Sequence, residues 1–131
     1  MRADTDDMTA QLDELSAELD TKQIANIRAL DTPGFDTLRE LSDLFAESSK
    51  KTLPTLQAAI DRGDMKAVQT TAHSLKGSAA SLGAREVARV CLAIEQGSKE
   101  GLAGGELNVL MRELGTHVDL TVAALKRINQ P

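Results

Sequence analysis

Apolar residues recur every three or four positions over most of this chain. The longest series lies between residues 106 and 128 and consists of Leu107, Leu110, Leu114, Val118, Thr121, Leu125 and Ile128. Residues at this spacing share one face of an α-helix, because the helix turns once every 3.6 residues. Strands are not indicated, since the sequence has no sustained apolar-polar alternation and no Asn-Gly or Asp-Gly hairpin turn. The sequence therefore predicts an all-α protein.

Four long helices follow from this pattern and from the residues that interrupt it. They are expected at about 32–62, 64–82, 85–96 and 106–128. Thr32 and Pro33 suit the start of the first helix, whereas Pro54 should kink that helix or split it near Thr52. The segment 97–105 holds four glycines in nine residues, which predicts a flexible loop before the last helix.

A shorter helical piece precedes these four helices. Its apolar residues form two thin stripes, Met8, Leu12, Leu15 and Leu19, followed by Ile24, Ile27 and Leu30. Asp20 or Thr21 could cap its second part, and residues 1–7 are expected to fray. Short connections make neighbouring helices antiparallel. We therefore expect an up-down four-helix bundle over residues 20–131, preceded by a partly helical N-terminal extension over residues 1–19.

Composition and charge exclude several classes of protein. The net charge of −5 argues against a nucleic-acid surface, which needs clustered positive charge. No run without Asp, Glu, Lys or Arg is longer than residues 52–60, far short of the roughly 20 apolar residues that span a membrane. The acidic first ten residues do not form a secretion signal, and a single cysteine cannot form an internal disulfide. These features favour a cytoplasmic protein, and Met1 with the acidic start favours a free-standing protein over a fragment.

The helix expected at 64–82 has an outer face that needs an explanation. On a helical wheel its apolar stripe is centred roughly 130° from His73. The residues surrounding His73 on this face are Lys66, Gln69, Thr70, Lys76, Gly77 and Ala80. Imidazole is a competent nucleophile near neutral pH, and Lys76 could pair with a phosphoryl group on its nitrogen. Gly77 would leave bare backbone beside His73, where a partner's active site could approach.

A structural explanation of the same residues is open at this point. A lone surface histidine usually has no special role, and a glycine inside a helix often marks close packing against a neighbouring helix. Such a glycine costs about 1 kcal/mol of helix stability relative to alanine. This cost is consistent with either explanation, approach of a partner or close helix packing. Spacing alone therefore does not decide between a phosphoryl-accepting face and an ordinary one.

The stretch AHSLKGSAASLGA, residues 72–84, closely resembles the signature of histidine-containing phosphotransfer (HPt) domains, which reads roughly AH-x-LKG-S-x-x-x-LGA. The resemblance extends over about residues 20–128. It implies that His73 accepts the phosphoryl group, that Lys76 stabilises this group and that Gly77 lets the partner approach.

The resemblance also implies a role for Glu95. HPt domains usually have a Glu or Gln near the end of the next helix, and this side chain hydrogen-bonds the histidine ring. Glu95 borders the apolar stripe of Ala88, Cys91 and Ile94, an odd place for a carboxylate without a partner. A carboxylate on Nδ1–H would fix the tautomer and leave Nε2 free to attack. An ordinary surface glutamate is the alternative.

By this resemblance, the protein is expected to be a phosphorelay carrier. It would take a phosphoryl group from a receiver-domain aspartate, or from a kinase, and pass it to another response-regulator receiver. The expected partners are receiver domains and a sensor histidine kinase, with no nucleic acid, no membrane and a monomeric chain. We expect no cofactor, with Mg²⁺ only in the receiver, and no enzyme activity, since no ATP site is recognisable. The alternatives are a phosphate-independent adaptor that docks a receiver and an excised domain of a hybrid sensor kinase.

Two other reactive side chains have simpler interpretations. His117 follows Glu113 by four residues in the last helix, and a solvated i,i+4 pair is favoured over a metal site. Paired Glu-x-x-His motifs, which bundle di-iron sites require, are absent from the sequence. Cys91 falls on an apolar helix face and is expected to be an inert core thiol.

Overall fold

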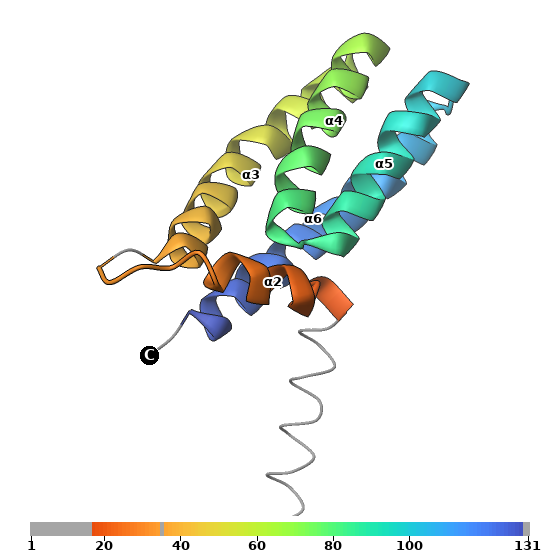
Figure 1. Ribbon diagram of the computed structural model, residues 1–131. Coiled ribbons are helices and arrows are strands. Elements are labelled where there is room, and N and C mark those ends of the chain that lie inside the picture. The colour runs from red at the N-terminus through yellow and green to blue at the C-terminus, as the bar shows by residue number, and fades with distance from the viewer. Residues whose placement is uncertain (1–16, 35, 130–131) are drawn as a thin grey trace, which may run out of the picture.

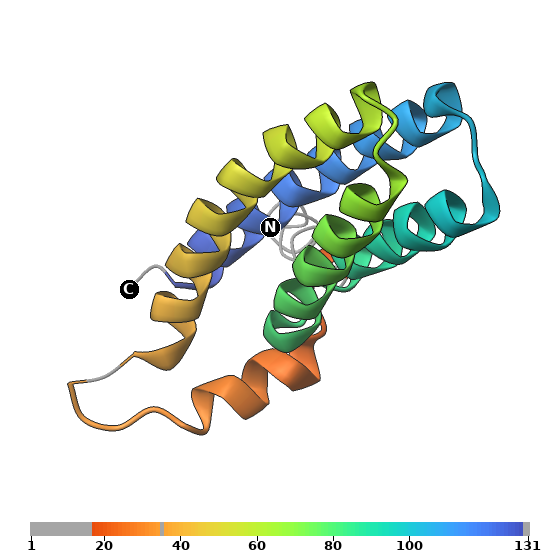
Figure 2. The ribbon, with the colours of Figure 1, turned by 90° about the horizontal axis from the view of Figure 1, so that it is seen from above.

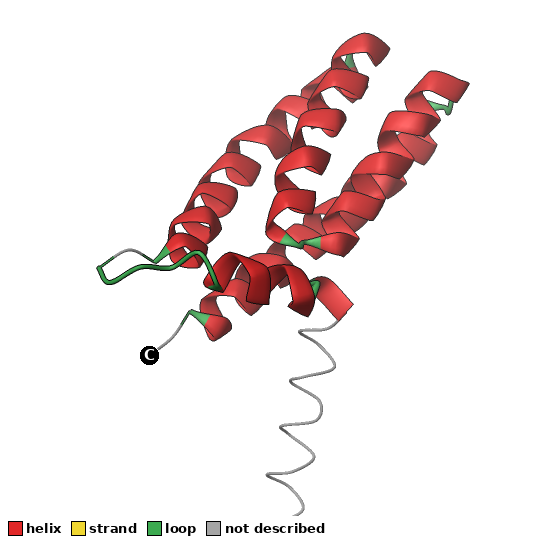
Figure 3. Cartoon of the chain, in the orientation of Figure 1, coloured by secondary structure: helices red, strands yellow, loops and turns green. Residues whose placement is uncertain are grey.

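The computed structural model describes residues 17–34 and 36–129, and this part of the chain consists of helices and loops without a strand (Figure 3). Its helices are α2 (Thr21–Arg28), α3 (Thr37–Asp61), α4 (Met65–Leu82), α5 (Arg85–Glu100) and α6 (Gly104–Ile128). Leu19 and Ala84 form one isolated β-bridge. The prediction of an all-α protein is confirmed.

The four long helices, α3 to α6, form the bundle. Contacts join α3 to α4, α4 to α5, α5 to α6 and α6 back to α3, so the four helices close a ring around one core. The short α2 lies across one end of the bundle and contacts α3 and α4 (Figures 1 and 2). The antiparallel up-down bundle with an additional N-terminal helix is therefore the observed fold. No described helix combines the length and apolarity needed to cross a membrane.

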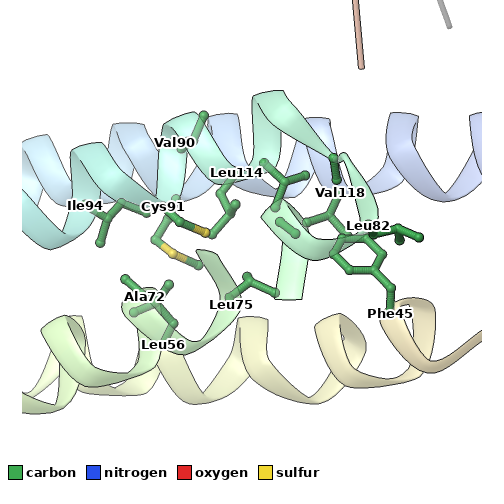
Figure 4. Packing of buried hydrophobic residues seen from close by; sticks show 14 of the residues in the cluster. Phe45, Leu56, Ala72, Leu75, Leu82, Val90, Cys91, Ile94, Leu114 and Val118 are labelled. Carbon is green, nitrogen blue, oxygen red and sulfur yellow. The ribbon is translucent and has the colours of Figure 1, made fainter. Parts of the chain in front are cut away.

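The core is built almost entirely from aliphatic side chains. Leu56, Leu75, Ile94 and Leu114, one from each long helix, are fully or almost fully buried, and Figure 4 shows them meeting between the helices. Phe45 is the one described aromatic residue in this cluster. Each buried aliphatic side chain contributes about 1.5–3 kcal/mol relative to an exposed one. Burial of the apolar helix faces that the sequence predicts thus supplies the free energy that holds α4 in place.

Helix α4 carries His73, and its ends are defined by local interactions. The Asp64 side chain accepts a hydrogen bond from the Ala67 amide at 3.1 Å and caps the N-terminus. Gly83 ends the helix at φ +85°, a backbone conformation that favours glycine. The predicted stripe is buried at Val68, Ala72, Leu75, Ala79 and Leu82. Because this stripe faces the core, the opposite side of α4 faces outward.

The chain before α2 is tied to the end of α4. The Asp20 amide donates to the Gly83 carbonyl at 2.7 Å, and Gln23 Nε2 donates to the Ser81 carbonyl at 2.9 Å. Asp20 also caps α2, as expected. Glu18 and Leu19, the last two residues of the expected extension, are buried against the bundle. Most of that extension, residues 1–16 with Met8, Leu12 and Leu15 of its apolar stripe, lies outside the described residues.

The predicted start of α3 is wrong, and of the two outcomes predicted at Pro54, a kink or a split, the split does not occur. The helix begins at Thr37 with Asp36 as its cap, rather than at Thr32 and Pro33, because Gly34 adopts φ +83° and interrupts a helical path. The helix then runs through Pro54 as one element, without the expected split near Thr52. Pro54 is exposed, so its ring and the gap that it leaves in the backbone hydrogen bonds lie on the solvent side of α3. The side chains that pack α3 against the bundle lie on the other side.

The predicted flexible loop at 97–105 is also largely helical. Helix α5 continues to Glu100 and α6 already begins at Gly104, so the connection is short. Leu102 packs directly against Gly97, where a Cβ atom would collide with its side chain. The buried Ser98 hydroxyl donates to the Glu95 carbonyl at 2.8 Å. Packing therefore overrides the glycine content in the first half of this segment.

Candidate functional site

His73 lies on the outward face of α4, and 67% of its side chain is exposed. Its ring is nevertheless held by the neighbouring helix, since Nδ1 lies 3.1 Å from Glu95 Oε2. The other ring nitrogen, Nε2, makes no hydrogen bond or ion pair with any residue of the described part of the chain. The imidazole is thus anchored at one nitrogen and open at the other.

Glu95 connects three side chains on α4 and α5. It lies in the last turns of α5, and only 10% of its side chain is exposed. Its Oε1 accepts a hydrogen bond from Lys76 Nζ at 2.8 Å, while Oε2 faces both His73 and Lys99 Nζ, the latter at 3.5 Å. The structure therefore brings together His73, Lys76 and Glu95, and adds Lys99 to them.

Sequence reasoning missed Lys99 at this site. The available signal was its position four residues after Glu95, which places both side chains on one face of a helix. The structure also gives Lys76 a partner that its place on the outer face of the helical wheel did not predict. Only 27% of the Lys76 side chain is exposed, and its ammonium is bound to the nearly buried Glu95 carboxylate.

The ionisation of Glu95 determines which ring nitrogen of the neutral His73 carries the proton. The hydrogen bond from Lys76 holds the pKa of Glu95 below its usual range, although burial acts in the opposite direction, and His73 contributes a smaller lowering. Glu95 is therefore a carboxylate at neutral pH and can only accept hydrogen bonds. In the neutral imidazole, Nδ1 then carries the proton that it donates to Glu95, and the lone pair is on Nε2.

A first prediction follows from the lowered pKa of Glu95. A carboxyl group whose pKa is lower in the folded than in the unfolded state adds stability above the unfolded-state pKa, and this stability is lost as the pH falls through the folded-state pKa. Wild type should therefore lose more unfolding free energy than Glu95→Gln between pH 6 and pH 3. Urea denaturation across this pH range measures the difference, and parallel losses in the two proteins would contradict it.

The surface around His73 consists of small and polar groups. A Cβ atom built on Gly77 would meet nothing within 4 Å, so no neighbouring helix of the described chain requires a glycine here. Lys66, Thr70 and Ala80 are exposed, and Gln69 is half-buried. The residues that the helical wheel places around His73 thus form one open face of α4.

The second histidine has a partner that the sequence did not suggest. His117 Nδ1 lies 3.1 Å from both carboxylate oxygens of Glu18, and both side chains are largely buried. Glu113, the expected i,i+4 partner, instead accepts a hydrogen bond from Arg89 at 2.7 Å. The predicted solvated pair is therefore wrong, and His117 ties the segment before α2 to α6.

Neither the cysteine nor a metal cluster adds a second reactive site to the described part of the chain. Cys91 is buried, and burial raises the pKa of its thiol to about 12, so the thiolate is not formed near neutral pH. Among residues 17–34 and 36–129, no group of three or more His, Cys, Asp and Glu side chains is arranged to hold a metal ion.

Comparison with known proteins agrees with this fold. Over 78 residues the chain is 33% identical to histidine-containing phosphotransfer protein 5 of Arabidopsis thaliana, covering 56% of this chain and half the length of that relative. The crystal structure of the histidine-containing phosphotransfer protein HptB from Pseudomonas aeruginosa PAO1 superposes with a TM-score of 0.74 at 25% identity, covering 85% of this chain and 93% of that one.

A plant structure shows the same fold at lower sequence similarity. The histidine-containing phosphotransfer protein ZmHP2 from maize superposes with a TM-score of 0.72 at 23% identity, over 96% of this chain and 99% of that one. The model of the Hpt domain family matches residues 40–127, which include α4, α5 and every residue that contacts Glu95. This match covers well over half of the 131 residues. The chain belongs to the Hpt domain family.

Proposed function

We propose that this protein carries a phosphoryl group on His73 between receiver domains, as one step of a phosphorelay. The supporting observation is the state of the ring, with Nδ1 held 3.1 Å from a carboxylate and Nε2 facing solvent. The curated relative shares only half its length with this chain, so its activity is carried over as part of the proposal. We place this activity in the cytoplasm, with Mg²⁺ in the receiver alone.

The proposed transfer requires one bond to form and one to break. The Nε2 lone pair of His73 attacks phosphorus as the bond between phosphorus and the receiver's aspartate oxygen breaks, and the aspartate leaves with that electron pair. The ring gains positive charge while Nδ1 keeps its proton. The Glu95 carboxylate beside Nδ1–H stabilises this charge at the moment it develops. The reverse reaction would load the next receiver.

Lys76 is suited to bind the transferred group. Its ammonium lies on α4 one turn beyond His73, on the side of Glu95. A phosphoryl group near neutral pH carries about 1.5–2 negative charges, and pairing with an ammonium forms strong charge-assisted hydrogen bonds. We infer that Lys76 turns from Glu95 toward the phosphoryl group after transfer, which its flexible stem permits.

Exposed apolar residues on α3 and α5, the two long helices that contact α4, offer a partner apolar surface to bury. Leu44 of α3 is 57% exposed and lies at a shallow hollow of about 370 Å³ that Ser78 and Ser81 of α4 also line. Leu92, one turn before Glu95 on α5, is 39% exposed. A receiver seated on α4 would thus bury apolar groups on both sides of the open face, which favours docking.

A two-step transfer experiment distinguishes the carrier from an adaptor. A receiver carrying a radioactive phosphoryl group is mixed with the protein and Mg²⁺, and the products are separated. The carrier predicts that the label moves to this protein, is lost in acid as an N–P bond is, and reaches a second, unlabelled receiver. An adaptor would bind the receiver while the label stays on the receiver's aspartate.

A further inference from the structure

Glu95 pairs with two lysines, Lys76 and Lys99, although one would be enough to balance its charge in the unphosphorylated protein. Lys76 is its closest partner at 2.8 Å and the main cause of its lowered pKa. Lys99 reaches the same carboxylate at 3.5 Å, on the oxygen that also faces His73 Nδ1. With 56% of its side chain exposed, Lys99 is also the more loosely held of the two lysines. In the unphosphorylated protein, Lys76 by itself can hold Glu95 in place.

The charge balance changes when His73 carries a phosphoryl group. About two negative charges are added at Nε2 and the ring gains one positive charge, so the site becomes more negative while the Glu95 carboxylate remains at the other nitrogen of the same ring. If Lys76 turns to the phosphoryl group, the nearly buried Glu95 loses its strongest partner. Without Lys99, Glu95 would then keep only Nδ1–H of His73 as a partner, and a nearly buried carboxylate with so little compensation would take up a proton or leave its position. Either response would release Nδ1–H from its acceptor.

We propose that Lys99 is a positioning residue that takes over Glu95 when Lys76 turns to the phosphoryl group, so that Nδ1–H keeps its acceptor. This inference depends on the proposed phosphoryl transfer to His73. Lys99 lies one turn beyond Glu95 in the last turn of α5, where its stem can bring the ammonium closer without moving the backbone. Its role is therefore confined to the phosphorylated state, in which the site has too few cations without it.

The test compares Lys99→Gln with a matched variant, Lys51→Gln. Lys51 is an exposed lysine on α3 that pairs with Glu47 at 3.5 Å, so its replacement removes the same charge from the same kind of i,i+4 pair. Both proteins are phosphorylated by a receiver, purified, and followed at pH 8. In Lys99→Gln we expect the phosphohistidine lifetime to shorten about two- to fivefold, the range set by one partly exposed ion pair. Lys51→Gln and Lys99→Arg should keep the wild-type lifetime.

A spectroscopic measurement separates positioning from a general effect of charge. The ¹⁵N signal of His73 Nδ1 reports its hydrogen bond, and in Lys99→Gln it should differ from wild type only in the phosphorylated protein. A lifetime and signal equal to those of Lys51→Gln would overturn the inference. The same signal change in both states would also overturn it, because Lys99 would then hold Glu95 at all times. A wild-type protein that takes no label would overturn the proposed function and this inference together.

Discussion

Replacing His73 with glutamine will reduce labelling from a phosphorylated receiver to background, the largest effect we expect from any single substitution. The glutamine amide has no nucleophilic lone pair on nitrogen, so no N–P bond can form. The fold should persist, because most of the His73 side chain is exposed and Glu95 keeps its hydrogen bond from Lys76. Acid-labile label and melting temperature, measured on the same preparation, test both statements.

The control for this experiment is the other histidine. His117→Gln should be labelled as wild type is, since His117 is largely buried and lies on α6 beside Glu18. Glutamine can donate an amide N–H to that carboxylate, so the substitution preserves the partner of a buried acid. Labelling of His73→Gln at the wild-type level would show that the phosphoryl group resides on another residue.

Enlarging residue 77 will slow transfer while the helix stays folded, and this is the second large effect. Gly77→Ala should stabilise the protein by roughly 0.5–1 kcal/mol, because alanine is the better helix former and its Cβ meets nothing within 4 Å. Transfer should fall mildly with alanine and severely with glutamine or leucine. A displacement of about 1 Å between reacting atoms can cost on the order of a hundredfold in rate.

Gly115 provides a matched control for the alanine variant. It lies within α6, and its Cβ would likewise meet nothing within 4 Å. Gly115→Ala should therefore raise the melting temperature as Gly77→Ala does, but leave the transfer rate unchanged. If stability and transfer fall together in Gly77→Ala, then Gly77 is a packing residue and the open face around His73 is not a docking surface.

The helices and their inward faces could be predicted from the sequence because helix geometry is local. A turn of 3.6 residues fixes which side chains share a face, whatever the rest of the fold does. The stripe of α4 and the outward position of His73 and Gly77 followed from this rule alone. The family signature at residues 72–84 then identified the histidine, which spacing without the resemblance did not do.

Helix boundaries were less predictable, since they depend on what the chain packs against. Gly97 weakens a helix on propensity, yet α5 continues through it because Leu102 fills the space beside it. Pro54 interrupts the hydrogen-bond ladder of α3 on the solvent side, while Leu56 and neighbouring buried residues hold the helix in place. In both cases packing energy exceeds a local preference of about 1–3 kcal/mol.

The polar contacts were decided by tertiary structure. His73 and Glu95 are 22 residues apart and meet because α4 and α5 lie side by side, and His117 meets Glu18 across 99 residues. The local i,i+4 rule selects Glu113 and not Glu18 as the partner of His117, and no local rule predicts that Lys76 pairs with Glu95 rather than with water. The sequence determined which residues face outward on α4, whereas the packing of α5 against α4 determined which nitrogen of His73 is held and which is free.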